Sequence, residues 1–402
     1  MIDGGEFSKP LSQRIALYQR SHANLGAGSG DEPAIGKSTG CFRRSTLDES
    51  AYESEQALRT HRIKNDAMGM SISVSGKARV RIPSGSRVFC VSHKDDPDGL
   101  ASAALVRCAT RCSFGLTGYE DLEKVLSEVP RDLDWLILTD LGLSEKTELI
   151  SGLCAIARHV LYVDHHLLSA ESKRALGKAN VITRHSLNDC TSVLAWNVFR
   201  HQLPEAAINL AAYGAVTDPP VSGHLTRQVM LKTSWNLDAY EGHLLALALS
   251  SPKCTDALRE RIVRGLAALR LPHEMSAVRR LADQQAADMP RIQRQLYNRA
   301  EVKGRVAIAR AGRLALGTTA ELLLGVPDVV ASLVYSTTAS SPHSRISVRG
   351  TDECGRHLGK LMSRLSRKFG GEGGGHMLAA GAMVPTKRIR AFLRLFIKEV
   401  GR

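Results

Sequence analysis

The sequence predicts an α/β protein in which a doubly wound, mostly parallel sheet is joined by a helical connector to a smaller α/β C-terminal domain. Three observations predict this fold class. Between residues 87 and 216, short apolar runs alternate with helix-forming segments, which is typical of parallel strands linked by crossover helices. Residues 224–300 carry helix formers throughout and no strand signal. Strand-like runs then resume after residue 300.

The first domain begins with apolar runs that predict strands over residues 87–92, 113–118 and 135–140. Helix-forming segments separate them, the first being rich in small residues over 100–110. The next run, 160–163, is continuously apolar and ends in Asp164-His165-His166. Such a run is typical of a parallel strand that is buried on both faces.

The rest of the chain completes this pattern. A short strand is expected over residues 181–183, and the helix expected over 203–216 reaches Asp218 just before a double proline that stops it. The last hundred residues predict, in order, strands near 305–310, 328–335 and 345–349, a helix over 355–369, a glycine-rich loop over 370–376, a strand over 379–384 and a basic amphipathic helix over 387–400.

The composition is that of a soluble globular protein, with 43% hydrophobic and 23% charged residues among 402. The longest apolar runs, such as 244–249, fall far short of the roughly 18 residues that span a bilayer. No secretory signal pattern opens the chain, so a cytoplasmic location without membrane association is expected. The eight cysteines form no CxxC pair and therefore do not indicate a thiolate zinc site.

The formal net charge of +14 favours acidic ligands such as nucleic acid or nucleotides, although solubility alone would also explain it. The charge is concentrated near the C-terminus. Residues 355–402 hold eleven Lys and Arg against two Glu. That end of the chain is expected to carry a positive face.

Acidic and imidazole side chains follow several predicted strands and helices at the point where each one ends. They are His93, Asp96, Asp98, Asp140, Asp164, His165, His166 and Asp218. Ligands of open α/β sheets collect beyond the carboxyl ends of the strands, so these side chains are expected to share one crevice. So many carboxylates in one place repel one another unless cations neutralise them.

This mixture of carboxylates and imidazoles suits Mg²⁺ or Mn²⁺, and the number of acids indicates two ions rather than one. Two such ions roughly 3.5–4 Å apart can clamp the attacking and leaving oxygens of a phosphoryl displacement. Each fragment alone has a simpler interpretation. Asp96-Pro97-Asp98-Gly99 is also a good turn, Asp140 could cap a helix, and Asp218 could be a turn residue. Their joint occurrence at the ends of elements favours the metal site.

Five segments in this order, SHKDDPDGLASAAL, LILTD, VDHH, GAVTD and FGGEGGGHMLAAG, resemble the DHH phosphoesterase superfamily, in particular its members with the DHH-associated C-terminal domain. The resemblance covers about residues 87–384. Together with the predicted elements, it gives a DHH metal-binding phosphoesterase domain over 71–223, a helical connector over 224–300 and a substrate-binding domain over 301–402. Residues 1–70 have no counterpart in the family, and because they are polar and show no sustained period they are expected to be a disordered extension. The family includes RecJ-type single-strand exonucleases, nano-RNases that dephosphorylate pAp, and cyclic dinucleotide phosphodiesterases.

The resemblance implies two divalent cations, Mn²⁺ before Mg²⁺, and hydrolysis by a metal-activated water. Carried over by position, His93 and Asp96 would hold one ion, Asp98 the other, and Asp140 would bridge both. His165 and Asp218 would complete the second site. Asp95 and Asp96 are adjacent, and Asp96 is the one that fits the Asp-x-Asp-Gly spacing. The catalytic residues would be His166, facing the substrate phosphate, and Asp164, orienting an imidazole.

The glycine-rich segment has a physical interpretation of its own, because backbone N–H groups without side chains can approach an anion closely. Gly373, Gly374, Gly375 and His376 are therefore predicted to bind substrate, and the family resemblance makes them a clamp for a terminal nucleotide or its phosphate. Arg345 and Arg349 on the preceding strand are further candidates for phosphate contacts, with a solvated strand face as the alternative.

These observations predict a soluble phosphoesterase that acts on short single-stranded oligonucleotides or small pAp-like nucleotides. The alternatives are a RecJ-like exonuclease on longer DNA or RNA and a non-catalytic DHH scaffold in a nucleic-acid complex. Inorganic pyrophosphatase shares the first half of the resemblance but not the glycine segment, and alanyl-tRNA-editing modules share only the second half. The oligomeric state is left open, with a homodimer among the alternatives.

Overall fold

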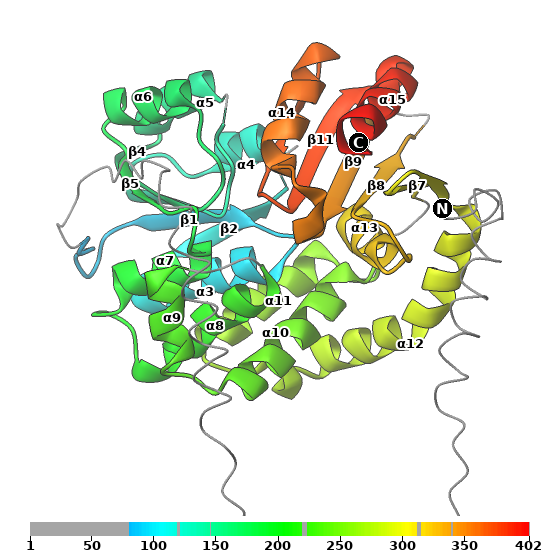
Figure 1. Ribbon diagram of the computed structural model, residues 1–402. Coiled ribbons are helices and arrows are strands. Elements are labelled where there is room, and N and C mark those ends of the chain that lie inside the picture. The colour runs from blue at the N-terminus through cyan, green and yellow to red at the C-terminus, as the bar shows by residue number, and fades with distance from the viewer. Residues whose placement is uncertain are drawn as a thin grey trace, which may run out of the picture. The chain divides into compact units, whose positions relative to one another are not determined.

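The computed structural model describes residues 80–118, 121–144, 146–218, 223–311, 315–338 and 341–401. The extension predicted over residues 1–70 lies outside these ranges. Two sheets and a set of helices make up the described part of the chain (Figure 1).

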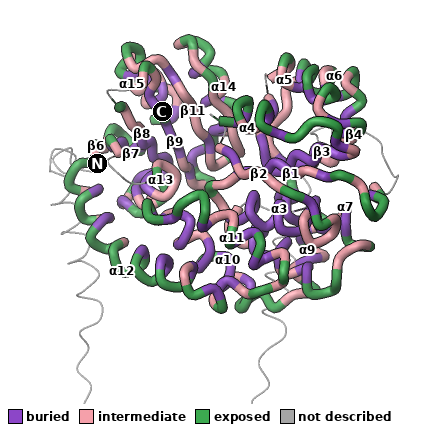
Figure 2. Tube along the Cα trace, turned by 180° about the vertical axis from the view of Figure 1, so that it is seen from behind, coloured by how far each residue is buried: buried purple, intermediate pink, exposed green. Residues whose placement is uncertain are grey.

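The first sheet has five parallel strands in the order β2-β1-β3-β4-β5. Its strands are β1 (Val88–His93), β2 (Ser113–Thr117), β3 (Leu133–Thr139), β4 (Ala157–Asp164) and β5 (Ile182–His185). The central strands β3 and β4 are buried on both faces, as their continuous apolar runs predict (Figure 2).

Helices cover both faces of this sheet. On one face, Ile137 and Val163 share a buried cluster with α3 (Pro97–Thr110), α7 (Thr191–Phe199) and α8 (Ile208–Thr217). On the other face, the alternate strand residues share a cluster with α4 (Leu122–Glu128), α5 (Thr147–Gly152) and α6 (Ala170–Lys178). A parallel sheet wrapped by helices on both sides is a doubly wound α/β domain, so the predicted fold class is confirmed.

Between residues 223 and 300 the chain forms helices and no strand. They are α9 (His224–Met230), α10 (Trp235–Ser250), α11 (Asp256–Ala267) and α12 (Ser276–Arg299). Their apolar residues extend the buried cluster that includes α3, α7 and α8. These helices therefore pack on the first domain as well as connecting it to the second.

The second sheet is mixed, with six strands in the order β10-β11-β9-β8-β7-β6. They are β6 (Glu301–Lys303), β7 (Val306–Arg310), β8 (Ala331–Ser336), β9 (His343–Gly350), β10 (Glu372–Gly375) and β11 (Ala379–Pro385). Only the pairing of β7 with β8 is parallel. Two separate buried clusters place α13 (Leu316–Leu324) apart from α14 (Leu358–Lys368) and α15 (Ile389–Val400).

Part of the glycine-rich segment, expected as a loop, is the edge strand β10. It pairs antiparallel with β11, and helix α14 lies against it. A Cβ atom on Gly359 of α14 would lie 2.0 Å from the carbonyl oxygen of Gly375. A Cβ on Gly375, whose φ is +135°, would lie 2.6 Å from the carbonyl oxygen of Ala379. Glycine is needed at these positions because the backbones approach so closely.

Candidate metal centre

The imidazole of His165 lies among three carboxylates that come from three other elements. Its Nε2 atom is 3.2 Å from Oδ2 of Asp218, 3.3 Å from Oδ1 of Asp140 and 3.8 Å from Oδ2 of Asp98. Asp98 is in the first turn of α3, Asp140 follows β3, His165 follows β4 and Asp218 ends α8. The structure therefore brings together four of the predicted ligands at the carboxyl edge of the parallel sheet.

The N-terminus of α7 holds two of these acids, which the sequence did not indicate. The backbone N–H groups of Thr191 and Ser192 donate to the two oxygens of Asp98 at 2.8 and 2.9 Å. The hydroxyl of Thr191 donates to Oδ1 of Asp140 at 3.1 Å. Because the first N–H groups of a helix carry partial positive charge, they stabilise carboxylates at this position. Helix α7 thus positions Asp98 and Asp140 together.

The end of β1 and the loop that leads to α3 carry the other two predicted ligands. Nε2 of His93 lies 3.4 Å from Oδ2 of Asp96. Asp96 is also the N-cap of α3, since its Oδ1 accepts a hydrogen bond from the N–H of Gly99 at 2.9 Å. The neighbouring Asp95 is engaged elsewhere, with its Oδ1 3.4 Å from the guanidinium of Arg259 on α11. This geometry favours Asp96 over Asp95 beside His93.

Arg259 reaches the same loop from α11, and no sequence signal pointed to it. Its Nε donates to the carbonyl oxygen of Lys94 at 3.0 Å, and its guanidinium also contacts Asp95 and the carbonyl oxygen of Cys254. The side chain is only 12% exposed. Arg259 therefore fixes the backbone next to His93 and Asp96.

The His166 ring is oriented by Asp164, two residues before it. Nδ1 of His166 lies 2.8 Å from Oδ1 of Asp164, while the backbone N–H of His166 donates to Oδ2 at 2.9 Å. The hydroxyl of Tyr162 donates to the same Oδ2 at 2.6 Å. Asp164 is buried with both oxygens engaged, so it holds a neighbouring imidazole, the arrangement predicted for it.

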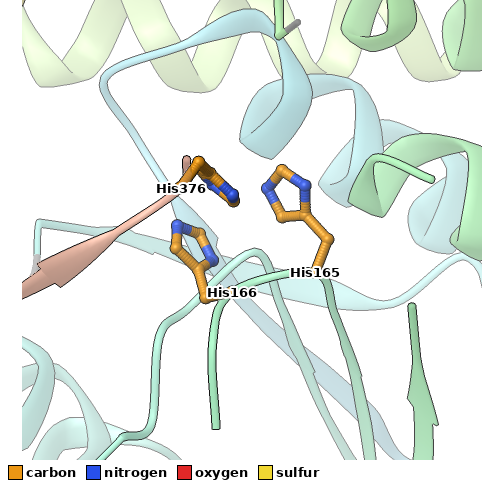
Figure 3. A group of neighbouring side chains, drawn as sticks. All are labelled: His165, His166 and His376. Carbon is orange, nitrogen blue, oxygen red and sulfur yellow. The ribbon is translucent and has the colours of Figure 1, made fainter. Parts of the chain in front are cut away.

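His376, which directly follows β10 of the second sheet, lies against both histidines (Figure 3). Its ring centroid is 4.4 Å from that of His165 and 4.8 Å from that of His166. The second sheet thus contributes a histidine that contacts both histidines at the end of β4 in the first sheet.

Arg349 on β9 lies within electrostatic range of the carboxylates. Its guanidinium is buried enough to lower its pKa, an effect opposed by the charges of Glu321, Asp218 and Asp96. Arg345 lies four residues earlier on the same strand, about 13 Å away along it, and is exposed. Gly373 and Gly374 belong to β10, where they pair with β11.

Comparisons with known proteins bear on the fold and on the C-terminal domain. Residues 304–402 match the family model of the DHHA1 domain. The DHH domain of a member of a family of ribosomal proteins superimposes with a TM-score of 0.59 at 15% identity, covering 79% of this chain and 87% of that one. The exonuclease RecJ bound to manganese superimposes with a TM-score of 0.51 at 16% sequence identity, covering 79% of this chain and 91% of that one. RecJ from Thermus thermophilus in complex with Mn²⁺ also has a TM-score of 0.51 at 16% sequence identity, covering 86% of this chain and 53% of that one.

Residues 304–402 form a DHHA1 domain, and the chain shares the fold of the DHH domain. The match confirms the predicted DHH-associated C-terminal domain, and the likeness to the solved structures shows the shared fold of the chain. A search of the curated proteins finds no match. Within the described part of the chain, no helix combines the length and apolarity needed to span a membrane.

Burial and crowding change the ionisation of the DHH carboxylates. Burial, together with the charges of Asp96 and Asp98, raises the pKa of Asp140 to about 6. Burial likewise raises the pKa of Asp218 to about 7, with Asp98 and Asp140 adding to the effect and His165 opposing it. Such shifts arise when like charges share a buried site. In the absence of a cation, these acids repel one another.

The carboxylates in turn change the pKa values of the two imidazoles of the DHH motif. Burial opposes protonation of His165, but Asp218, Asp140 and Asp98 outweigh it and raise the pKa of His165 well above its usual value. Asp164 in the same way outweighs the burial of His166 and raises its pKa. For His376 of the DHHA1 domain, the charge of Asp164 raises the pKa less than burial lowers it. Burial and its two histidine neighbours lower its pKa to about 2, so the ring is neutral.

The residues of the DHH site fit a divalent cation. Oδ2 of Asp140 is fully buried and has no hydrogen-bond partner among the described residues. Buried carboxylate oxygens without partners are costly, and a cation would satisfy this one. Three groups bring potential ligand atoms within 4.8 Å of one another: Asp98, His165 and Asp218; Asp140, Asp164 and His166; and His165, His166 and His376. Carboxylates with imidazoles are a donor set for Mg²⁺ or Mn²⁺.

Proposed function

We propose that this protein is a metal-dependent phosphoesterase that hydrolyses phosphodiester or phosphomonoester bonds of short single-stranded oligonucleotides or small pAp-like nucleotides. The observation that carries the proposal is the buried, unpartnered Oδ2 of Asp140 within a group of described acids whose pKa values are raised. Such perturbed groups concentrated at a sheet edge are typical of functional sites. The DHH fold that the chain shares with RecJ supports the same chemistry.

The proposal assigns two divalent cations, Mn²⁺ before Mg²⁺, to six side chains. These are His93, Asp96, Asp98, Asp140, His165 and Asp218. Asp140 would contribute to both sites, because it lies beside His165 on one side and is influenced by Asp96 on the other. When bound, such cations polarise phosphoester oxygens and make water a stronger acid at neutral pH.

His166 and Asp164 act on the substrate side of the proposed reaction. Asp164 fixes the orientation of the His166 ring through three hydrogen bonds that involve Tyr162 and the His166 backbone. In the proposed reaction, the His166 ring, oriented by Asp164, would donate a proton to a phosphate oxygen. Because the carboxylate raises the pKa of His166, the ring can carry that proton near neutral pH.

The DHHA1 domain would bind the nucleotide. His376 offers a neutral ring beside both histidines of the DHH motif, and Arg349 offers a guanidinium within electrostatic reach of Asp218. Arginine binds phosphate oxygens in a bidentate manner. Gly375 contributes by its close packing, which sets the position of His376, and Gly373 and Gly374 continue the same strand. Arg345 would contact a more distant phosphate.

The test is a hydrolysis assay with and without Mn²⁺ across pAp, dinucleotides, longer single strands of RNA and DNA, cyclic dinucleotides and pyrophosphate. Mn²⁺-dependent release of nucleoside monophosphate or phosphate from pAp and dinucleotides is expected, with slower release from the longer strands. No hydrolysis of any substrate, with the protein folded and Mn²⁺ bound, would leave the non-catalytic scaffold as the better assignment. Preference for pyrophosphate would reject the nucleotide assignment.

A RecJ-like exonuclease acting on longer strands is the second candidate. It is favoured by the exposed basic side chains on α14 and α15. The same panel separates it from the first candidate, because it predicts faster cleavage as the strand becomes longer.

A further inference from the structure

Three imidazoles from the two sheets lie next to one another. His165 and His166 follow β4 of the first sheet, and His376 follows β10 of the second. The ring centroids of His165 and His376 are 4.4 Å apart, and each lies 4.8 Å from that of His166. One nitrogen atom of each ring is within 4.8 Å of the other two (Figure 3). A small rotation of the rings would let all three bind one ion.

This three-histidine group differs in chemistry from the other two ligand groups of the centre. Those groups contain carboxylates, Asp98 and Asp218 in one and Asp140 and Asp164 in the other. Oxygen ligands suit Mn²⁺ or Mg²⁺, whereas imidazoles suit Zn²⁺, which binds a given nitrogen site more tightly than Mn²⁺ does. Three histidines with an open fourth position are a ligand set for zinc. The three-histidine group is therefore expected to favour Zn²⁺ over Mn²⁺.

The part of the group in the first sheet is held by Asp164. One oxygen of Asp164 lies 2.8 Å from Nδ1 of His166, and the other accepts a hydrogen bond from the Tyr162 hydroxyl at 2.6 Å. Histidines that bind metals usually contact a carboxylate or carbonyl through one ring nitrogen, which fixes the ring and makes it a stronger ligand. Asp164 therefore orients His166 in the way that is typical of a metal-bound histidine.

The part of the group in the second sheet is held by backbone hydrogen bonds of His376. Its N–H donates to the carbonyl oxygen of Ala379 in β11 at 2.7 Å, and its carbonyl oxygen accepts from the N–H of Gly359 in α14 at 2.8 Å. A strand and a helix therefore both fix the backbone that carries this ring. Ligands on rigid elements are positioned precisely before a metal binds.

His165 belongs to two of the three ligand groups. Its Nε2 atom lies 3.2 Å from Oδ2 of Asp218 and 3.3 Å from Oδ1 of Asp140, two of the acids proposed to hold Mn²⁺. An ion bound by the three imidazoles would compete with Mn²⁺ for His165. It would also occupy His166 and His376, which are proposed to contact the substrate. Such an ion is therefore incompatible with the metal arrangement and the substrate contacts of the proposed reaction.

We propose that His165, His166 and His376 form a Zn²⁺ site, different in its ligand set from the proposed Mn²⁺ sites, whose occupation inhibits hydrolysis. The inhibitory role rests on the proposed function, whereas Zn²⁺ binding by the three histidines does not. Because the ligands come from both sheets, the bound ion would also join the DHHA1 domain to the DHH motif. Mn²⁺ and substrate should each compete with Zn²⁺.

The test compares the full-length wild-type protein with two variants and a control. His376→Gln and His166→Gln each remove one imidazole from the group and none of the proposed Mn²⁺ ligands. The control, His201→Gln, removes an exposed imidazole beyond the end of α7. Zn²⁺ affinity is measured by competition with a chromophoric chelator, Mn²⁺ affinity by calorimetry and folding by circular dichroism.

Both variants should bind Zn²⁺ at least about 100-fold more weakly than wild type, because losing a ligand should exceed the effect, about 10- to 100-fold, of losing the partner of a ligand. Their Mn²⁺ affinity should be unchanged, and His201→Gln should match wild type for both ions. In a dinucleotide assay with Mn²⁺, the Zn²⁺ concentration that halves the rate should rise by a similar factor in His376→Gln. Raising Mn²⁺ should weaken the inhibition of wild type.

Equal Zn²⁺ affinity in wild type and both variants would overturn the inference, because Zn²⁺ would then be held by the carboxylates. Losses of Zn²⁺ and Mn²⁺ affinity of equal size would also overturn it. Zn²⁺ bound through the histidines without slower hydrolysis would reject the inhibitory role.

Metal binding and hydrolysis separate the two proposals. If the wild-type protein hydrolyses nothing but needs His376 to bind Zn²⁺, the phosphoesterase proposal fails and the Zn²⁺ site stands. If Mn²⁺-dependent hydrolysis is intact and Zn²⁺ binds equally well without the His376 ring, the Zn²⁺ site is rejected alone.

Discussion

Nδ1 of His166 lies 2.8 Å from a carboxylate oxygen of Asp164, and the backbone N–H of the same histidine donates to the other oxygen at 2.9 Å. One acid thus fixes both the ring and the backbone of its neighbour. The His166 charge and hydrogen bonds overcome the effect of burial and hold the pKa of Asp164 well below its usual range. A carboxylate so placed stays ionised and determines which ring nitrogen of His166 faces away from it.

Replacing Asp164 with asparagine should therefore lower activity without removing a proposed metal ligand. We expect kcat to fall about 10- to 100-fold, the range for partners that orient a site histidine. The Mn²⁺ affinity measured by calorimetry should change little. The control is Asp134→Asn, a partly exposed acid that accepts a hydrogen bond from the Arg87 N–H and should leave kcat unchanged. A loss of Mn²⁺ affinity as large as the loss of kcat would instead make Asp164 a ligand.

Arg259 offers a test of how the helices beyond the DHH domain support the site. Its guanidinium contacts the carbonyl oxygen of Lys94 and the carboxylate of Asp95, on the loop between His93 and Asp96. Arg259→Gln should leave these partners without a cation, and the Mn²⁺ concentration for half-maximal activity should rise about 10-fold. Arg259→Lys keeps the charge but lacks the several N–H donors of a guanidinium, so it should reverse only part of this rise in the required Mn²⁺ concentration. Unchanged metal dependence in Arg259→Gln would show that the loop holds its shape alone.

Replacing His376 tests whether its ring binds the substrate or takes part in the chemical step. His376→Ala should raise KM for nucleotide substrates more than it affects hydrolysis of the generic diester bis-p-nitrophenyl phosphate, because a generic substrate lacks the groups that the ring would contact. His376→Gln keeps a hydrogen-bonding group and should be milder. If both substrates lose activity equally and Mn²⁺ binds more weakly, the ring belongs with the metal ligands, as its contact with His165 would allow.

The parallel sheet and the polar residues at its edge followed from the sequence, because buried parallel strands are continuous apolar runs and their ends converge. Asp98, Asp140, His165 and Asp218 meet accordingly. No sequence pattern indicated Arg259, or Thr191 and Ser192, because their roles depend on contacts between segments far apart in the chain. Such contacts leave no local periodicity.

The glycine-rich segment shows a different limit of structure prediction from the sequence. Repeated glycines allow both a loop that receives an anion and a strand against which a helix packs closely, and local sequence does not choose between them. Here Gly359 of α14 approaches Gly375 so closely that packing explains the glycines at these two positions. The helices α6 and α13 were not predicted either, since α6 is short and mostly polar and α13 lies between two strands of the second sheet.

The buried acids also predict how the metal-free protein responds to pH. The pKa values of Asp140 and Asp218 are raised to about 6 and about 7. An acid whose pKa is higher in the folded state binds its proton more tightly there than in the unfolded chain, so the folded state loses stability as pH rises through this range. In EDTA, the free energy of unfolding attributable to these groups should therefore decrease between about pH 4 and pH 7.

The variant Asp140→Asn isolates this effect, because asparagine keeps an oxygen for the Thr191 hydroxyl but cannot ionise. In EDTA near pH 8 the variant should be more stable than wild type by about 1–3 kcal/mol, and the difference should vanish near pH 4. With Mn²⁺ the order should reverse, because wild type gains about 3 kcal/mol at a hundredfold excess over Kd and the variant loses that gain with its activity. Urea unfolding at three pH values with and without Mn²⁺ measures both. A pH-independent difference between the two proteins would mean that Asp140 is not under electrostatic strain.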